Sequence, residues 1–160
     1  MKASRSHRAP HGQALTEFAL IVPLLVIVFM GVIEFGRFVL AYETLNNATR
    51  EGARYAIVHG GDSVCPSGPM PGGGTSPSSC ADQSCTNVIN RVVQYGFTLR
   101  LVASQVAITY GDRACGTAGN GDNARGSSVT VTTNYTFSTI LPVPLPPIPM
   151  TGRSTLVINH

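Results

Sequence analysis

The fold is decided by residues 18–33, which read FALIVPLLVIVFMGVI and carry no charge. As a helix, this run would span roughly 24 Å, somewhat less than the ~30 Å hydrocarbon core of a bilayer. The apolar pattern resumes after Glu34 and Arg37, which are placed to neutralise each other near the interface, and residues 18–42 would reach about 37 Å. A core helix of a soluble domain is rarely apolar on every side. The run therefore predicts one transmembrane helix that continues beyond the membrane.

Basic residues before this run predict its orientation. Lys2, Arg5 and Arg8 lie in the first twelve residues, where no acidic residue occurs, and positive charge marks the cytoplasmic side of a span. Removing these 3 from the 11 Lys and Arg leaves 8 basic against 8 acidic side chains, so no nucleic-acid partner is indicated. A cleaved secretory signal is the weaker interpretation, because no small-x-small site closely follows. We expect a single pass, with the N-terminus in the cytoplasm and the rest outside.

The stretch before the span has a recognisable pattern. Residues 12–18 read GQALTEF, in which a glycine ends the basic leader and a carboxylate stands at the mouth of the apolar run. This pattern resembles the processing site of type IV prepilins, and most closely that of the TadE-like proteins of tight-adherence (Flp) pili. The resemblance covers roughly residues 12–57 and includes Ala19, Pro23, Ala48, Gly52, Ala53 and Arg54.

The resemblance implies roles for four residues of this motif. A membrane aspartyl prepilin peptidase would cut between Gly12 and Gln13, while Glu17 and Phe18 match the family's glutamate and the aromatic residue after it. Cleavage would leave an ammonium on Gln13, one helical turn from Glu17. In a pilus this ammonium would pair with Glu17 of the same or a neighbouring subunit. The simpler alternative is that Glu17 only complements the helix dipole.

The function implied is that of a TadE-like minor pilin or pseudopilin in the bacterial cytoplasmic membrane. It would act in assembly of a tight-adherence type IVb pilus used in cell adhesion, with the prepilin peptidase and other pilin subunits as partners. Filament subunit and membrane-platform component both remain open. The alternative is an uncleaved, signal-anchored cell-envelope protein whose head binds a partner or ligand. No GxSxG, HExxH or paired-carboxylate motif occurs, so we expect no enzyme, cofactor or small-molecule substrate.

The helix is expected to continue through residues 43–59, which contain no proline. Ala48, Gly52 and Ala56 recur every fourth residue and form a stripe of small side chains. We favour packing of this stripe on the chain's own head, and a contact between subunits is the alternative. Gly60 and Gly61 should end the helix.

All the cysteines follow the span: Cys65, Cys80, Cys85 and Cys115. An even number in a small exported domain predicts disulfides, for which three pairings are possible. A bond between Cys65 and Cys80 would close the loop of residues 60–81, which is rich in Gly, Pro and Ser. Buried free thiols are the alternative. No metal site is expected, because CxxC is absent and the histidines are scattered.

Patterning after residue 81 predicts the remaining elements of the head. A short helix is expected within residues 82–96, with Asp82 as its N-cap and Gly96 as its stop. Alternating apolar residues predict strands, which we place at residues 106–110, 128–137 and 153–159. The proline-rich residues 141–149 are expected to form a stiff polyproline connector, in preference to a partner-binding segment.

These expectations combine into an α+β fold. A long N-terminal transmembrane helix would continue into a small extracytoplasmic head with a mostly antiparallel sheet. The expected divisions are a basic leader (1–12), the transmembrane and extended helix (13–59) and the head domain with its Gly- and Pro-rich loops (60–160).

Overall fold

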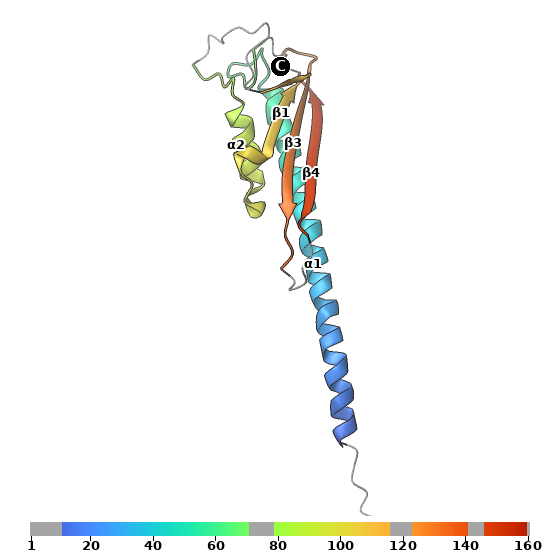
Figure 1. The fold of residues 1–160 in the computed structure, drawn as a ribbon. Helices are drawn as coiled ribbons and strands as arrows, with labels where there is room; N and C mark the ends of the chain where they lie inside the picture. The colour runs from blue at the N-terminus through green and yellow to red at the C-terminus, as the bar shows by residue number, and fades with distance from the viewer. Residues whose placement is uncertain (1–10, 71–78, 116–122, 141–145, 160) are drawn as a thin grey trace, which may run out of the picture.

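The computed structural model describes residues 11–70, 79–115, 123–140 and 146–159. One uninterrupted helix, α1 (His11–Val58), holds both the apolar run and its predicted continuation. The first part of α1 projects from a small head that packs against its last part (Figure 1). The predicted leader, residues 1–10, lies outside the described residues.

The head combines a short helix with a sheet. Helix α2 (Thr86–Tyr95) is followed by two short 3-10 helices, η1 (Phe97–Leu99) and η2 (Ala103–Gln105). The sheet has four antiparallel strands in the order β2-β1-β3-β4. The strands are β1 (Val106–Tyr110), β2 (Arg113–Ala114), β3 (Ser128–Phe137) and β4 (Ile148–Val157). The fold is α+β, as the sequence predicts.

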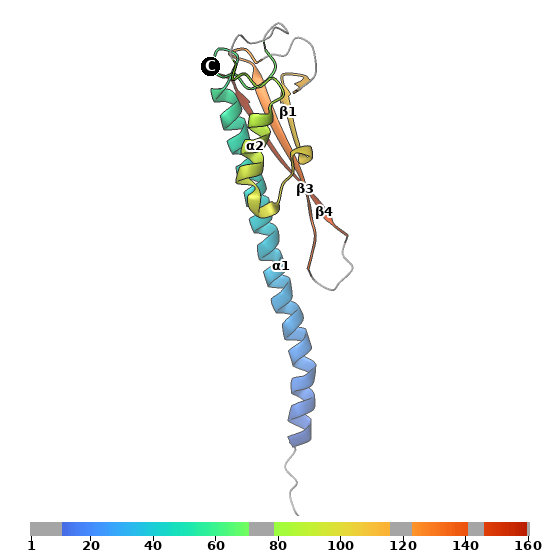
Figure 2. The same cartoon turned by 90° about the vertical axis from the view of Figure 1, so that its left-hand side faces the viewer.

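The core lies between the sheet and the second half of α1. That half packs on β3, β4 and α2, which lies beside it (Figure 2). Alternate residues of the strands face this core, because successive side chains of a strand point to opposite faces. Leu45 of α1, Val92 of α2, Tyr110 of β1 and Val131 of β3 are all fully buried. Each large apolar side chain buried here contributes about 1.5–3 kcal/mol to stability.

Both helix ends in the head follow the glycine signals. α1 stops at Val58, just before Gly60. α2 stops at Tyr95, and the N–H of Gly96 donates to the carbonyl oxygen of Val92 over 2.9 Å. These two predictions are confirmed.

The start of α2 corrects the predicted N-cap. Cys85 occupies that position, with φ 58°, and its side chain makes no capping hydrogen bond. Asp82 caps the helix from three residues earlier, because its Oδ2 accepts the N–H of Asn87 over 2.6 Å. Partial burial works to raise the pKa of Asp82, but hydrogen bonds from Asn87, Ser84 and other neighbours outweigh it, so this pKa lies below its ordinary value.

The last strand is longer than predicted. β4 begins at Ile148 rather than at residue 153, and it ends at Val157. Ile148 and Pro149 pair with Phe137 and Thr136, so the end of the predicted polyproline connector belongs to the sheet. Pro149 is tolerated because β4 is an edge strand, where a missing N–H need not break the ladder. Residues 141–145 of the expected connector lie outside the described residues.

Strand β2 was not predicted at all. It consists of Arg113 and Ala114 alone. Two residues show no periodicity, so pairing with Thr109 and Tyr110 of β1 is what defines this strand.

Candidate functional site

The first part of α1 exposes an apolar surface on all its sides. Every residue from Gly12 to Ile33 is exposed. The most apolar 18-residue window has a mean hydropathy of 2.7, and 0% of it is buried. The core helix of a soluble domain also has high hydropathy, but such a helix is covered by its own protein. By length and composition α1 can cross a membrane, since residues 14–33 alone would span about 30 Å.

The motif residues lie in the first two turns of this helix. Gly12 and Gln13 fall in the first turn, and the hydroxyl of Thr16 donates to the carbonyl oxygen of Gln13 over 2.8 Å. Glu17 follows one turn later, about 6 Å further along the axis. Phe18 next to it is 67% exposed. The structure thus places the predicted cleavage bond at the beginning of α1 and the carboxylate just inside the helix.

Glu17 has no ion-pair partner among the described residues. The ion pairs found there are Arg37 with Glu34, Arg91 with Glu51 and Arg125 with Asp62. An ionised carboxylate at the centre of a span costs about 2.5–3.5 kcal/mol, and less near an interface. A positive partner brought to Glu17 would therefore stabilise the embedded helix.

A second polar cluster marks the end of the apolar run. Nη1 of Arg37 donates to both carboxylate oxygens of Glu34, over 2.9 and 2.8 Å. Oε1 of Glu34 also accepts the backbone N–H of Ile140, over 3.1 Å. The guanidinium of Arg37 lies 5.4 Å from the ring centroid of Phe137, which packs edge-on against Phe38. The sequence predicts the pairing of Glu34 with Arg37. It does not predict the hydrogen bond to Glu34 from Ile140, which lies in the connection between β3 and β4.

The stripe of small residues faces the chain's own head. Ala48, Gly52 and Ala56 are buried. A Cβ on Gly52 would collide with Cγ2 of Val92 in α2 and come within 3.7 Å of Val131 in β3. In this structure the stripe therefore brings α1 close to α2 and the sheet.

We expect Gly52→Val to destabilise the head by about 1–3 kcal/mol, because the new side chain overpacks the contact with Val92. This corresponds to a melting temperature lower by roughly 4–20 °C for a domain of this size. The measurement is thermal unfolding of the detergent-solubilised protein, followed by circular dichroism.

The matched control for this variant is Gly36→Val on the same helix. A Cβ on Gly36 would meet nothing within 4 Å, so this variant carries the same change in helix propensity without the collision. Equal melting temperatures for the two variants would contradict the packing assigned to Gly52.

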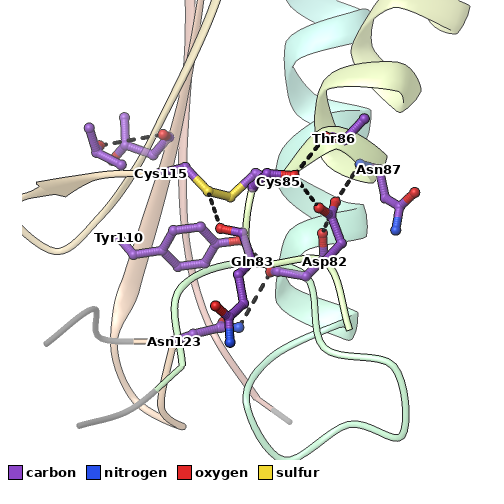
Figure 3. The surroundings of a disulfide bond; sticks show 12 residues. Asp82, Gln83, Cys85, Thr86, Asn87, Tyr110, Cys115 and Asn123 are labelled. Carbon is purple, nitrogen blue, oxygen red and sulfur yellow. Dashed lines mark hydrogen bonds between the residues drawn. A yellow bond between two sulfur atoms is a disulfide. The ribbon is translucent and has the colours of Figure 1, made fainter. Parts of the chain in front are cut away.

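Two disulfides tie the distal end of the head together. Cys65 bonds to Cys80, and Cys85 bonds to Cys115. The first closes the Gly- and Pro-rich loop, in agreement with the pairing considered for it. The second joins the start of α2 to the residue after β2 (Figure 3). The described chain contains no free cysteine.

A hydrogen-bond network that includes Tyr110 and Asn123 lies beside the second disulfide (Figure 3). The carbonyl oxygen of Ser67 accepts the hydroxyl of Tyr110 over 2.7 Å and Nδ2 of Asn123 over 3.3 Å. Burial raises the pKa of Tyr110 well above its ordinary value, and the negative charge of Asp82 adds to this. The tyrosine therefore stays a neutral donor, and the network serves to hold the loop after α1 against β1.

A solvent-open groove lies over the head part of α1. Its volume is about 550 Å³, and its lining includes Arg50, Glu51 and Arg54 of α1 with Tyr95 of α2. Within the described ranges, no group of three or more His, Cys, Asp or Glu is placed to hold a metal ion. The groove is the feature that the alternative of a ligand-binding head would use.

Comparison with protein families gives a match within α1. The family described as TadE-like protein matches residues 12–54. This range is just over a quarter of the chain and lies wholly within α1, so it includes the motif and the small-residue stripe but not the sheet. The resemblance recognised in the sequence is confirmed over this range. No curated protein and no solved structure matches the chain.

Proposed function

We propose that this chain is a TadE-like minor pilin or pseudopilin, anchored by α1 in the bacterial cytoplasmic membrane, that acts in assembly of a tight-adherence type IVb pilus. It acts through contacts with other subunits and not through catalysis. One observation carries the proposal: the helix that matches the TadE-like family also exposes an apolar surface on every side up to Ile33. A helix of that kind needs either lipid or other apolar helices around it, and a membrane-assembled pilus provides both.

The residue chemistry at the start of α1 supports processing by a prepilin peptidase. A Cβ on Gly12 would meet nothing within 4 Å, so packing within the described chain does not require glycine there. A peptidase whose active site approaches the backbone closely would require it. The proposed cut lies between Gly12 and Gln13.

Cleavage also gives Glu17 the partner that the described chain does not offer. The new ammonium of Gln13 would lie one helical turn away, on the same or a neighbouring subunit. In surroundings without water, pairing these charges removes most of the cost of embedding either one. A register that matches Glu17 with an ammonium is therefore favoured over one that does not.

The orientation follows from the two ends of the chain. The leader carries Lys2, Arg5 and Arg8, so it stays in the cytoplasm. The head carries two disulfides, which persist in an oxidising compartment outside the cytoplasm. The protein is a single-pass membrane protein in this proposal, with its head outside.

The test is the mass of the mature protein, extracted with detergent from cells that contain an active prepilin peptidase. We expect a chain that begins at Gln13 in the wild type, and a retained leader in Gly12→Val. Gly36→Val is the control, because it adds the same side chain to an open position of α1 and should be processed normally. A wild-type chain with an intact leader would contradict the proposal and favour the uncleaved, signal-anchored alternative.

A further inference from the structure

We infer that the tip of the β3–β4 hairpin, defined here by Ile140 and Ile148, is a second membrane contact that rests in the outer leaflet of the bilayer. This inference depends on the span and the orientation proposed for α1, and not on processing or pilus assembly. Its occupant is lipid, at the boundary between headgroups and acyl chains.

The hairpin descends alongside α1 toward the apolar run (Figure 1). Oγ1 of Thr49 donates to Oγ1 of Thr133 over 3.1 Å, and Glu34 accepts the N–H of Ile140 at the same distance. From Thr49 to Glu34 the helix covers about 22 Å, and from Thr133 to Ile140 an extended chain covers about 23 Å. The helix and the extended chain therefore cover nearly the same distance along the axis of α1, and Ile140 lies at the level of Glu34.

Glu34 marks the outer surface of the hydrocarbon core. Residues 14–33 span about 30 Å, which is the thickness of that core. Glu34 and Arg37, which pair with each other, directly follow this segment. Because Ile140 is bonded to Glu34, it lies at the same boundary.

The exposed residues at this end of the hairpin suit lipid better than water. Ile140 is 70% exposed and Ile148 is 41% exposed. No charged residue occurs in the connection between the strands, residues 138–147. Shielding an isoleucine from water is favourable, and a tip that faced water would forfeit this stabilisation.

Four described residues at this end of the hairpin leave no backbone N–H unsatisfied. Polar backbone groups enter a bilayer only when they are satisfied. The N–H of Ile140 is bonded to Glu34. Pro146, Pro147 and Pro149 have no N–H to satisfy, and all three are exposed. Phe137 anchors the strand that carries the tip, through its contacts with Arg37 and Phe38.

A second contact would fix the head relative to the membrane. A single helix leaves the head free to rotate about the helix axis and to tilt with it. A hairpin tip held in the outer leaflet, off that axis, removes the rotation. The face of the head presented to neighbouring subunits would then be set before assembly.

The sequence contains no tryptophan, so single-tryptophan variants report depth without background. We would reconstitute the full chain in phosphatidylcholine vesicles, with or without brominated acyl chains, and measure quenching of Ile140→Trp. Val26→Trp serves as the reference inside the proposed span. Val64→Trp serves as the reference in water, since Val64 is 86% exposed. It belongs to the loop after α1, and that loop lies at the end of the head away from the apolar run (Figure 1).

We expect strong quenching of Val26→Trp and at least about twofold more quenching of Ile140→Trp than of Val64→Trp, because side chains at this boundary reach the acyl chains. Ile148→Trp repeats the measurement on the paired strand and should agree. Quenching of Ile140→Trp and Ile148→Trp no greater than that of Val64→Trp would overturn the inference. The span would stand if Val26→Trp were still quenched, and would fall as well if it were not. Blue-shifted but unquenched emission at Ile140 would mean that protein covers the tip, which also overturns the inference.

Discussion

Replacement of both Leu25 and Val28 by arginine is expected to release the chain from the membrane. The twelve Phe, Leu, Ile and Val side chains of residues 18–33 together favour insertion by about 4–7 kcal/mol. Two central arginines oppose it by about 5–7 kcal/mol and remove two of the favourable side chains. The balance falls near zero or becomes unfavourable, so most of the chain should fail to insert.

The control for this pair is Leu25→Ala with Val28→Ala, which removes the same apolar side chains without adding charge. Alkaline extraction of membranes, followed by quantification of the pellet, measures the outcome. The wild type and the alanine pair should remain in the pellet, while the arginine pair should be extracted or degraded. An arginine pair that remains in the pellet as fully as the wild type would show that α1 does not span the bilayer.

Removal of the Cys85–Cys115 disulfide, by Cys85→Ala with Cys115→Ala, is expected to destabilise the head by about 3–4 kcal/mol. Its cysteines are 30 residues apart, and a loop of that length gives about 3.5 kcal/mol in the chain-entropy model. Cys85 is fully buried at the start of α2, so its removal also disturbs the core. For a domain of this size the melting temperature should fall by roughly 12–30 °C.

The matched control is the other disulfide, removed by Cys65→Ala with Cys80→Ala. These cysteines are 15 residues apart, which gives about 3 kcal/mol in the same entropy model. Cys80 is exposed, so little packing is lost with it. Thermal unfolding in detergent should therefore show a smaller loss than for the Cys85–Cys115 pair. An equal or larger loss of thermal stability would contradict the greater contribution assigned to the Cys85–Cys115 disulfide.

Most of the architecture was predictable because its signals are local. The apolar run needs no partner to be recognised, and Gly60 and Gly96 end their helices as glycines commonly do. Strands β1 and β3 were recognised because their alternating side chains, such as Val106 and Ile108, face one core.

The errors came from contacts that override a local signal. Ile148 and Pro149 belong to a proline-rich stretch, yet pairing with β3 makes them part of β4. Asp82 lies near the start of α2, but the chain turns between it and the helix, so it caps from outside the N-cap position. Neither the longer β4 nor the capping by Asp82 can be predicted from the local sequence, because each depends on a contact with another segment.

The motif at the start of α1 and the polar cluster at Glu34 also differ in whether the sequence alone reveals them. The motif around Gly12 and Glu17 is contiguous, so the sequence alone revealed it and the family match includes it. The attachment of Ile140 to Glu34 joins residues 106 positions apart. The pairing of the cysteines was equally open, because three connectivities satisfy the same count. Only the folded chain brings such residues together.

The central claim is that α1 crosses the membrane and holds a disulfide-bonded head outside the cytoplasm. To test it, cells are quenched with acid, and the membrane fraction is isolated and treated with an alkylating reagent, either before or after reduction. The mass of the protein then gives the number of alkylated cysteines. We expect a membrane-bound chain with no alkylated cysteine before reduction and all 4 alkylated after it. A chain recovered in the soluble fraction, or one whose cysteines react without reduction, would contradict it.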